Sequence, residues 1–340
     1  MDGTQLTTAL EMMAHEHAAD VGDLARALVE ALYTEVLRST GADDAHVSLD
    51  LETGDLEVTI TEGDEVKVLD FADMGRRGAA VLKNAFDAVV LDLRRERLAA
   101  LLERRAGQVV SGRVRHVNDQ VIVVQLDDGV EAELPVSHAP GLRPRTGAAV
   151  SALLTGRIES AGGVVRAQLS RKPDEFILRL LEEAVPSIAD GSIEIVKFAR
   201  EPGVRTKLVV RRTDPNGPDP VALIIGSGGQ TIRQVTDAAY PERIDVMEEA
   251  DLVELTTRAL APGKVRHVEV NDSEIVVYVT DEERPAIFGR GGWNVKLATE
   301  LVGRHIRVVS PGDDGEEDGS SGIDGDVNSE LVEAAESVSD

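Results

Sequence analysis

The sequence lacks cysteine, contains few aromatic residues and has no long uncharged apolar run, and each absence excludes a class of protein. Without cysteine the chain has no disulfide framework and no thiolate metal site, which favours a reducing compartment. No apolar stretch approaches the roughly 20 residues that a membrane-spanning helix requires. The first residues include acids and histidines instead of the basic start and apolar core of a signal peptide. We therefore expect a cytoplasmic protein that makes no membrane contact.

The motifs of common enzymes are missing as well. Serine, histidine and aspartate are scattered without a nucleophile elbow, and the sequence has neither a His-Glu-x-x-His zinc motif nor a Walker loop. An acidic run at Asp313–Gly319 has the composition of a calcium loop but not its spacing, so a solvated acidic segment is the better interpretation. The sequence therefore predicts a protein that is not an enzyme and has no catalytic residues, cofactor or metal site.

Positive charge is scarce, and it is unevenly distributed. The formal net charge is −26 over 340 residues, which by itself argues against nucleic-acid binding. Residues 313–340 contain 11 acids and no lysine or arginine, and residues 1–106 sum to −11. Residues 107–172, in contrast, sum to +2, and residues 187–310 sum to only −3. Because a phosphate responds to charge within about 10 Å, the middle of the chain can still present basic patches.

The periodicity of apolar residues divides the first half of the chain. Helical spacing over 5–40 is followed by two short alternating runs around a turn, and then by one long helical pattern at 74–105 that Gly107 ends. From 108 to 169 the period changes to two, in five short runs separated by Asn, Asp and Gly turns. Five short strands in about 60 residues are typical of an OB-type barrel.

The barrel segment offers weaker signs of nucleic-acid binding. Residues 107–170 contain no Phe, Tyr or Trp on which bases could stack. Several of their arginines fit either a non-specific phosphate surface or an ordinary solvated surface. These arginines are Arg113, Arg115, Arg143, Arg145 and Arg157.

A repeat in the second half of the chain is its most informative feature. Each copy contains two strand-like runs, a short apolar helix, a glycine loop, a second helix and a final strand. The loops, Gly226-Ser-Gly-Gly229 and Gly289-Arg-Gly-Gly292, lie 63 positions apart. A helix, a Gly-x-x-Gly loop and a helix packed on a three-stranded sheet form the KH arrangement, which holds about four nucleotides of a single strand. We therefore expect a multidomain α+β protein that binds single-stranded RNA.

The residue types around these loops suit contact with a sugar-phosphate backbone. Glycine lets that backbone approach closely, and the free amides at the start of the next helix favour phosphate. Trp293 fits either base stacking or packing of its helix, and the cations of a hairpin before the first loop fit either a basic rim along the RNA or a solvated turn. The candidate RNA-binding residues are Gly226, Ser227, Gly228, Gly229, Arg233, Gly289, Arg290, Gly291, Gly292, Trp293, Asn294 and Lys296, with Arg200, Arg205 and Lys207 at the hairpin.

Several sequence strings, in one order, carry a resemblance to a known family. The strings are Leu169-Ser-Arg171, Val185-Pro-Ser-Ile-Ala-Asp-Gly191, Ala199-Arg-Glu-Pro-Gly-Val-Arg-Thr-Lys207, Asp219-Pro-Val221, Arg243-Ile-Asp-Val246, Ala259-Leu-Ala-Pro-Gly-Lys264 and Gly289-Arg-Gly-Gly-Trp-Asn-Val-Lys-Leu-Ala298. Together with the domain layout, they make the chain resemble the NusA family of bacterial transcription elongation and termination factors.

The resemblance implies a modular RNA-binding factor. It would be a monomer that binds RNA polymerase, nascent single-stranded RNA and further elongation or antitermination factors, and that modulates pausing, termination and antitermination. Two departures from the family pattern are the first glycine loop, which lacks the usual cation, and Trp293, which replaces a small or polar residue. The implied parts are an N-terminal polymerase-docking α/β domain with a long connecting helix (1–106), an S1-type OB barrel (107–172), two tandem type II KH domains (173–250 and 251–310) and a disordered acidic tail (311–340).

Two alternatives remain open at this point. Barrel and KH modules would equally suit a protein of mRNA or ribosome metabolism that never contacts polymerase. The run Leu223-Ile-Ile-Gly-Ser-Gly-Gly-Gln-Thr-Ile232 also resembles a dinucleotide-binding fingerprint, with Asp245 about 20 residues away. Thr231 stands where that fingerprint needs its third glycine, and hairpins rather than buried parallel strands flank the motif.

Overall fold

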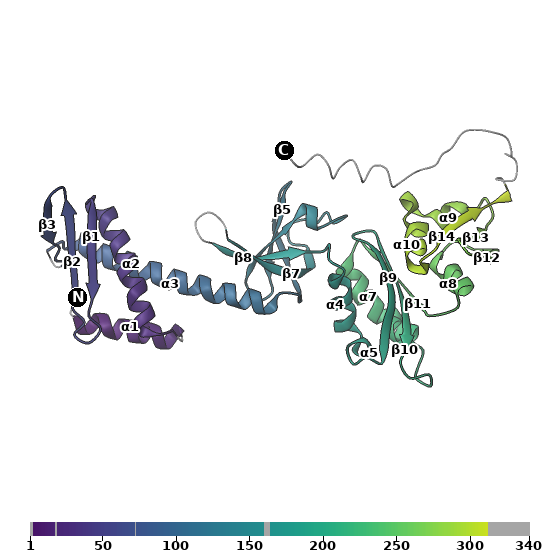
Figure 1. The fold of residues 1–340 in the computed structure, drawn as a ribbon, viewed down its shortest axis with the longest axis horizontal. Helices are drawn as coiled ribbons and strands as arrows, with labels where there is room; N and C mark the ends of the chain where they lie inside the picture. The colour runs from purple at the N-terminus through teal and green to yellow at the C-terminus, as the bar shows by residue number, and fades with distance from the viewer. Residues whose placement is uncertain (1–2, 18, 72, 160–163, 312–340) are drawn as a thin grey trace. The chain divides into compact units, whose positions relative to one another are not determined.

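The computed structural model describes residues 3–17, 19–71, 73–159 and 164–311 (Figure 1). The chain separates into two units, one formed by the residues up to His138 together with Pro144–Ser170, the other by Ala139–Arg143 together with the chain from Arg171 onward. The predicted multidomain α+β class is confirmed. The predicted disordered tail lies, from residue 312 on, outside the described residues. No helix in the described ranges is long and apolar enough to span a membrane.

The first unit begins with three helices and an antiparallel sheet in the order β1-β2-β3. The helix α2 begins where Asp20 accepts hydrogen bonds from the amides of Gly22 and Asp23, and it ends at Gly41 in the left-handed conformation. Its buried face, with Leu28 and Leu32 fully enclosed, forms the centre of this core. The elements are α1 (Gly3–His17), α2 (Val21–Thr40), β1 (Asp44–Leu49), β2 (Leu56–Glu62), β3 (Glu65–Val68) and α3 (Arg76–Arg105).

The second part of this unit is a closed five-stranded barrel in the order β4-β5-β6-β8-β7, as the period of two predicts. Burial alternates along β5, where Ile122, Val124 and Leu126 point inward. Glycine is required at position 112, where β4 pairs with β5, because a Cβ there would lie 2.4 Å from the carbonyl oxygen of Gln125. The elements are β4 (Val109–Val117), β5 (Val121–Leu126), β6 (Glu131–Pro135), η1 (Val136–His138), β7 (Ala149–Glu159) and β8 (Val165–Ser170).

The second unit contains the two copies of the repeat. In each copy the middle strand of a three-stranded sheet pairs antiparallel with one neighbour and parallel with the other. The first copy consists of α4 (Glu175–Ala184), α5 (Pro186–Ala189), β9 (Ile193–Glu201), β10 (Arg205–Arg212), α6 (Pro220–Ile225), η2 (Ser227–Gly229), α7 (Gln230–Ala239) and β11 (Arg243–Glu248). The second consists of α8 (Leu252–Ala259), β12 (His267–Val270), β13 (Glu274–Tyr278), α9 (Arg284–Phe288), η3 (Arg290–Gly292), α10 (Trp293–Val302) and β14 (His305–Val309).

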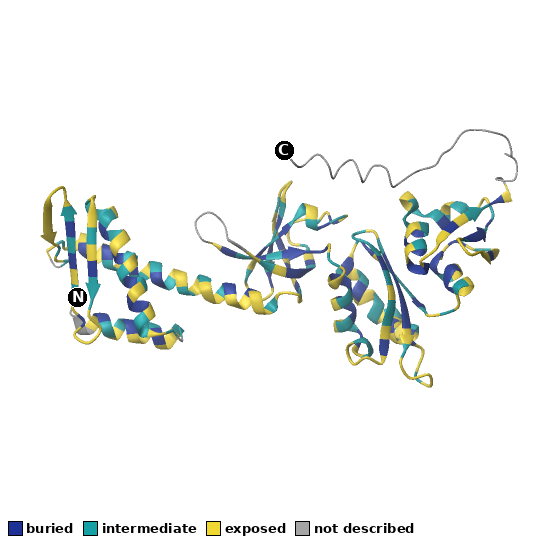
Figure 2. Ribbon diagram, viewed as in Figure 1, coloured by how far each residue is buried: buried dark blue, intermediate teal, exposed yellow. Residues whose placement is uncertain are grey.

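The two copies share one apolar core. Helix α10 of the second copy packs on strands β9 and β10 of the first as well as on its own β14. Ala199, Val209 and Met247 of the first copy therefore belong to the same buried cluster as Leu297 and Leu301 of the second. Buried positions run through strands and helices of both copies (Figure 2). The two copies therefore pack against each other and are not independent domains joined by a linker.

The N-terminal core provides a direct test of the fold. Leu28→Ala should destabilise residues 3–105 by about 2–5 kcal/mol, because it removes a fully buried side chain and leaves a cavity. Met12→Ala is the matched control, since Met12 is 68% exposed in the same domain. Amide hydrogen exchange of α2 in the full chain measures the effect. Equal protection of α2 in the two variants would contradict this core.

Candidate nucleic-acid interface

The two glycine loops have the same backbone geometry. In each copy a short apolar helix ends at a glycine with positive φ, 72° at Gly226 and 69° at Gly289. A side chain is excluded at both positions: a Cβ would lie 2.2 Å from the hydroxyl oxygen of Thr231 in the first copy and 2.8 Å from Cβ of Asn294 in the second. These two glycines therefore shape the loops, whatever the loops bind.

The later glycines of each loop leave open space. A Cβ at Gly228, Gly229 or Gly292 would meet no atom within 4 Å. The helices that follow, α7 and α10, have no side-chain hydrogen bond at their N-caps, and their first amides, those of Gln230 and Trp293, bind the loop carbonyls of Ser227 and Arg290. Unobstructed glycines in front of the positive end of a helix form a surface that a phosphate can approach.

The second loop carries more charge than the first. Arg290 within the loop and Lys296 one turn into α10 are both exposed, and Arg290 forms no ion pair with the described residues. In the first copy Ser227 stands in place of Arg290, and the nearest exposed cation is Arg233 on α7. The second loop is therefore the better anion site of the two.

Trp293 lies at the start of α10, half-buried beside the second loop. The ammonium group of Lys296 is 4.2 Å from the centre of its ring. One face of the indole is thus covered by the chain's own cation, and its edge lies near Gly291, where a Cβ would be 3.4 Å from Cδ1. Base stacking by Trp293 stays a prediction, and it requires either the other face or displacement of Lys296.

Asn294 does not face a ligand. Its side chain is buried, and its Nδ2 donates hydrogen bonds to the carbonyl oxygens of Leu260 (3.0 Å), Ile287 (3.0 Å) and Ala286 (3.3 Å). This burial contradicts the expectation that Asn294 bonds RNA. The amide instead joins the end of α8 to the end of α9, directly before the second loop.

Arg200 is also turned inward. Its guanidinium, 1% exposed, binds both carboxylate oxygens of Glu242 at 2.8 and 3.1 Å. It donates further hydrogen bonds to the carbonyls of Arg171, Lys172 and Pro173. Glu242 also accepts from the amide of Gly203 and from the hydroxyl of Thr206. The two charges of this buried pair are thus matched and hydrogen-bonded, as burial of charge requires.

The other two hairpin cations are shielded as well. Lys207 is fully buried, and its Nζ binds Asp245 at 3.0 Å and the carbonyl of Ala259 at 2.7 Å. The side chain of Arg205 is 15% exposed and pairs with the same carboxylate at 2.5 Å. The predicted basic rim of Arg200, Arg205 and Lys207 is therefore wrong. Glu242 and Asp245, about 40 positions further along the chain, pair with these cations and keep them away from solvent.

Two exposed cations that the sequence reasoning missed are Arg243, at the start of β11, and Lys264, beside the helix that leads into the second loop. Arg243 and Lys264 form no ion pair with any residue that the structure describes. The backbone amide of Lys264 binds Glu283, and a Cβ at the adjacent Gly263 would strike Ile287 of α9, so this segment lies against the helix that leads into the loop. The sequence does not reveal which cations pair with acids, so it did not distinguish these two.

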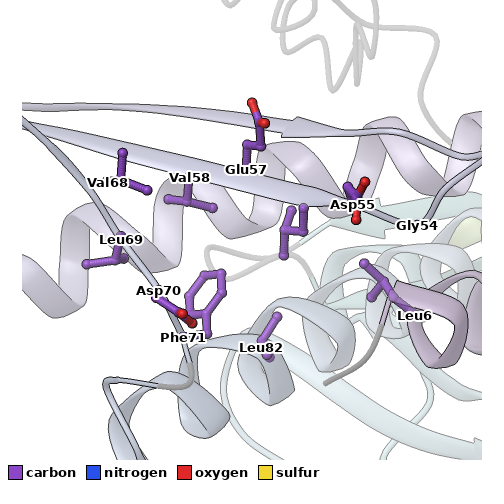
Figure 3. Close-up of a pocket in the computed structure, with 11 residues that line it drawn as sticks. Leu6, Gly54, Asp55, Glu57, Val58, Val68, Leu69, Asp70, Phe71 and Leu82 are labelled. Atoms are coloured by element: carbon purple, nitrogen blue, oxygen red, sulfur yellow. The ribbon is translucent and has the colours of Figure 1, made fainter.

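A hollow of about 370 Å³ lies in the N-terminal domain, between the β2–β3 strands and the helices α1 and α3 (Figure 3). Apolar side chains line it, among them Leu6, Phe71 and Leu82, and Phe71 points into it. The carboxylate of Glu57 points away from the hollow, and Asp55 is exposed beside it. The hollow is lined by apolar side chains and by acids, Asp70 as well as Asp55, and this combination suits a protein segment that carries apolar and basic side chains.

The buried pair predicts a stability effect without loss of a direct RNA contact. Arg200→Met should destabilise the second unit by about 3–5 kcal/mol, because it leaves Glu242 buried and unpaired. Arg211→Met, which removes an exposed ion pair from β10, should have little effect. Urea unfolding followed by Trp293 emission measures both. Equal midpoints for the two variants would refute a buried pair at Arg200.

Comparison with known proteins agrees with this geometry. Residues 171–249 match the model of a NusA-like first KH domain, and residues 252–316 that of a NusA-like second KH domain. The transcription termination/antitermination protein NusA of Bacillus subtilis is 28% identical over 91% of this chain and 92% of its own length. The proteins of the same name from Thermus thermophilus and Mycobacterium bovis are 31% and 28% identical, over 72% and 88% of this chain and 64% and 91% of their own lengths. With two KH domains of the NusA type following a closed barrel, the chain belongs to the NusA family.

Proposed function

We propose that this chain is an RNA-binding transcription factor that holds nascent single-stranded RNA on its two glycine loops and modulates pausing, termination and antitermination by RNA polymerase. The observation that carries the proposal is the duplicated loop: open glycines in front of helix starts whose amides are not capped by side chains. Relatives along most of the chain are named transcription termination/antitermination proteins, which supports a role in transcription.

The proposed RNA contacts differ from those expected from sequence alone. Gly226, Gly289 and Asn294 shape the loops, and the buried cations Arg200 and Lys207 are removed from the contact set. Arg243 and Lys264 join it as exposed cations without an ion pair among the described residues, and Lys264 lies beside the helix that leads into the second loop. The direct contacts we propose are Ser227, Gly228, Gly229, Arg233, Arg243, Lys264, Arg290, Gly291, Gly292, Trp293 and Lys296.

We also propose that residues 1–106 dock on RNA polymerase, with the rest of the chain carrying RNA. The net charge of −11 in this segment and the apolar hollow with its acidic rim support a basic, partly apolar docking site on the partner. The alternative, an RNA-binding protein of mRNA or ribosome metabolism, needs no such surface and is separated from the first by the polymerase experiment below.

The loops can be tested in the full chain with two matched variants. Arg290→Asp with Gly291→Asp should weaken binding of a single-stranded oligoribonucleotide at least tenfold, because it removes a cation and places two carboxylates in the loop where the phosphate would bind. Ser227→Asp with Gly228→Asp alters the equivalent positions of the first loop and should cost less, since that loop has no cation to remove. Aspartate tolerates the left-handed conformation of these glycines.

Binding is measured by titration at several salt concentrations, with Trp293 emission in the absence of RNA as a control for folding. The slope of log affinity against log salt should become shallower for the second-loop variant, by about 0.7 for each phosphate that the variant no longer neutralises. A wild-type chain that ignores RNA would refute the proposed function, and unaffected binding by both variants would move the RNA site elsewhere.

Polymerase docking predicts a charge effect in the N-terminal domain. Asp55→Lys with Glu57→Lys should weaken capture of bacterial core RNA polymerase while leaving RNA affinity unchanged, because the rim of the hollow becomes basic. Glu11→Lys with Glu16→Lys makes the same change in charge on α1 and should have a smaller effect. Equal capture by wild type and the rim variant would remove this hollow from the docking surface.

A further inference from the structure

The end of helix α8 is held by polar groups from both copies of the repeat. Three consecutive backbone carbonyls accept hydrogen bonds from side chains there. The Nζ of Lys207 binds the carbonyl of Ala259 at 2.7 Å, the amide of Asn294 binds that of Leu260 at 3.0 Å, and the guanidinium of Arg205 reaches that of Ala261 at 3.5 Å. The first and third donors belong to the first copy, and the second belongs to the second.

This arrangement connects the sheet of the first copy to the loop of the second. Asp245 on β11 holds Lys207 and Arg205 together on the neighbouring strand β10. Asn294, which binds the middle carbonyl, also binds the carbonyl of Ile287 and packs against Gly289 at the start of the second loop. A series of hydrogen bonds therefore runs from the first sheet, through the end of α8, to the second glycine loop.

The buried Lys207–Asp245 pair ties the end of α8 to strands β10 and β11. Burial lowers the pKa of Lys207, and Asp245 only partly opposes this. Burial would also raise the pKa of Asp245, but Arg205 and Lys207 outweigh it and hold that pKa below its usual value. The lysine is satisfied only while the negative C-terminal end of α8 lies in place, because a fully buried ammonium cannot exchange the carbonyl of Ala259 for bulk solvent. Displacement of α8 would leave a charge without its partners.

We infer that Lys207, Arg205 and Asp245 are positioning residues that fix the second glycine loop at a set distance from the first. The inference rests on the proposed function, since it concerns how the two loops cooperate on one RNA. Two loops on one body bind a long strand with an advantage that neither has alone, and this advantage is reduced when the spacing no longer matches the strand. The three side chains touch no RNA in this scheme.

The experiment compares short and long RNA on the full chain. A single-stranded oligoribonucleotide of about 4 nucleotides can occupy one loop, whereas one of about 12 can reach both. Lys207→Met should leave the affinity for the short strand within about twofold and reduce the advantage of the long strand at least tenfold. Arg211→Met, near the exposed end of the same strand, should leave both affinities unchanged.

The salt dependence separates positioning from direct contact. If Lys207 only positions the second loop, the slope for the short strand stays the same in the variant, whereas removal of a cation that touches phosphate would make it shallower by about 0.7. If Trp293 emission shows that Lys207→Met does not fold, the double variant Lys207→Met with Asp245→Asn is used, because it removes both charges of the Lys207–Asp245 pair. Arg205 loses its ion pair there but stays partly solvated.

The outcomes are distinct. An unchanged ratio of long-strand to short-strand affinity in the variant overturns the positioning role while leaving RNA binding intact. A shallower slope for the short strand overturns it in favour of direct contact. If the wild-type chain binds neither strand, the proposed function itself fails, and that result is recognised before any variant is made.

Discussion

Burial of positive charge is the constraint on which the tandem KH unit depends. Arg200 and Lys207 lie in the interior of a chain that binds, on our proposal, a polyanion, and each is satisfied by an acid and by backbone carbonyls. A buried cation with one partner removed costs several kcal/mol, so these contacts must all form together. The linker at Arg171–Asp174 and the end of α8 are held in place because they supply the carbonyls.

The overall class of the fold could be predicted from sequence because its signals are local. The period of two over residues 108–169 corresponds to the closed barrel, and the repeated glycine loops correspond to two backbone turns of the same geometry. Gly226 and Gly289 could be recognised because each stands at the same place in its copy of the repeat, between a short apolar helix and the loop. The shared core of the two copies was not foreseen, since nothing in the pattern of α10 reveals that it packs on two sheets.

The candidate site could be predicted only in part, and the errors have one physical cause. Arg200, Arg205 and Lys207 form a cluster beside a turn, which on sequence alone is typical of a solvent-exposed basic patch. Glu242 and Asp245, about 40 positions away, turn that cluster inward, and such long-range pairing has no local signature. Asn294 was misjudged for the same reason, because its three carbonyl partners come from the ends of α8 and α9. Cations that pair with acids inside the protein are not available to RNA, so only those that remain exposed and unpaired are candidates for contact with it.

The long helix α3 has a geometric consequence for how the family can vary. Its first half packs on α2 and its end contacts β7 of the barrel, and neither glycine nor proline interrupts it after Gly78. Each residue in a continuous helix adds about 1.5 Å of length and about 100° of rotation. A single insertion would therefore turn the barrel to a different side of the N-terminal sheet, whereas a change of about seven or eleven residues, close to two or three whole turns, would nearly restore its direction. The length of α3 is thus expected to change in discrete steps.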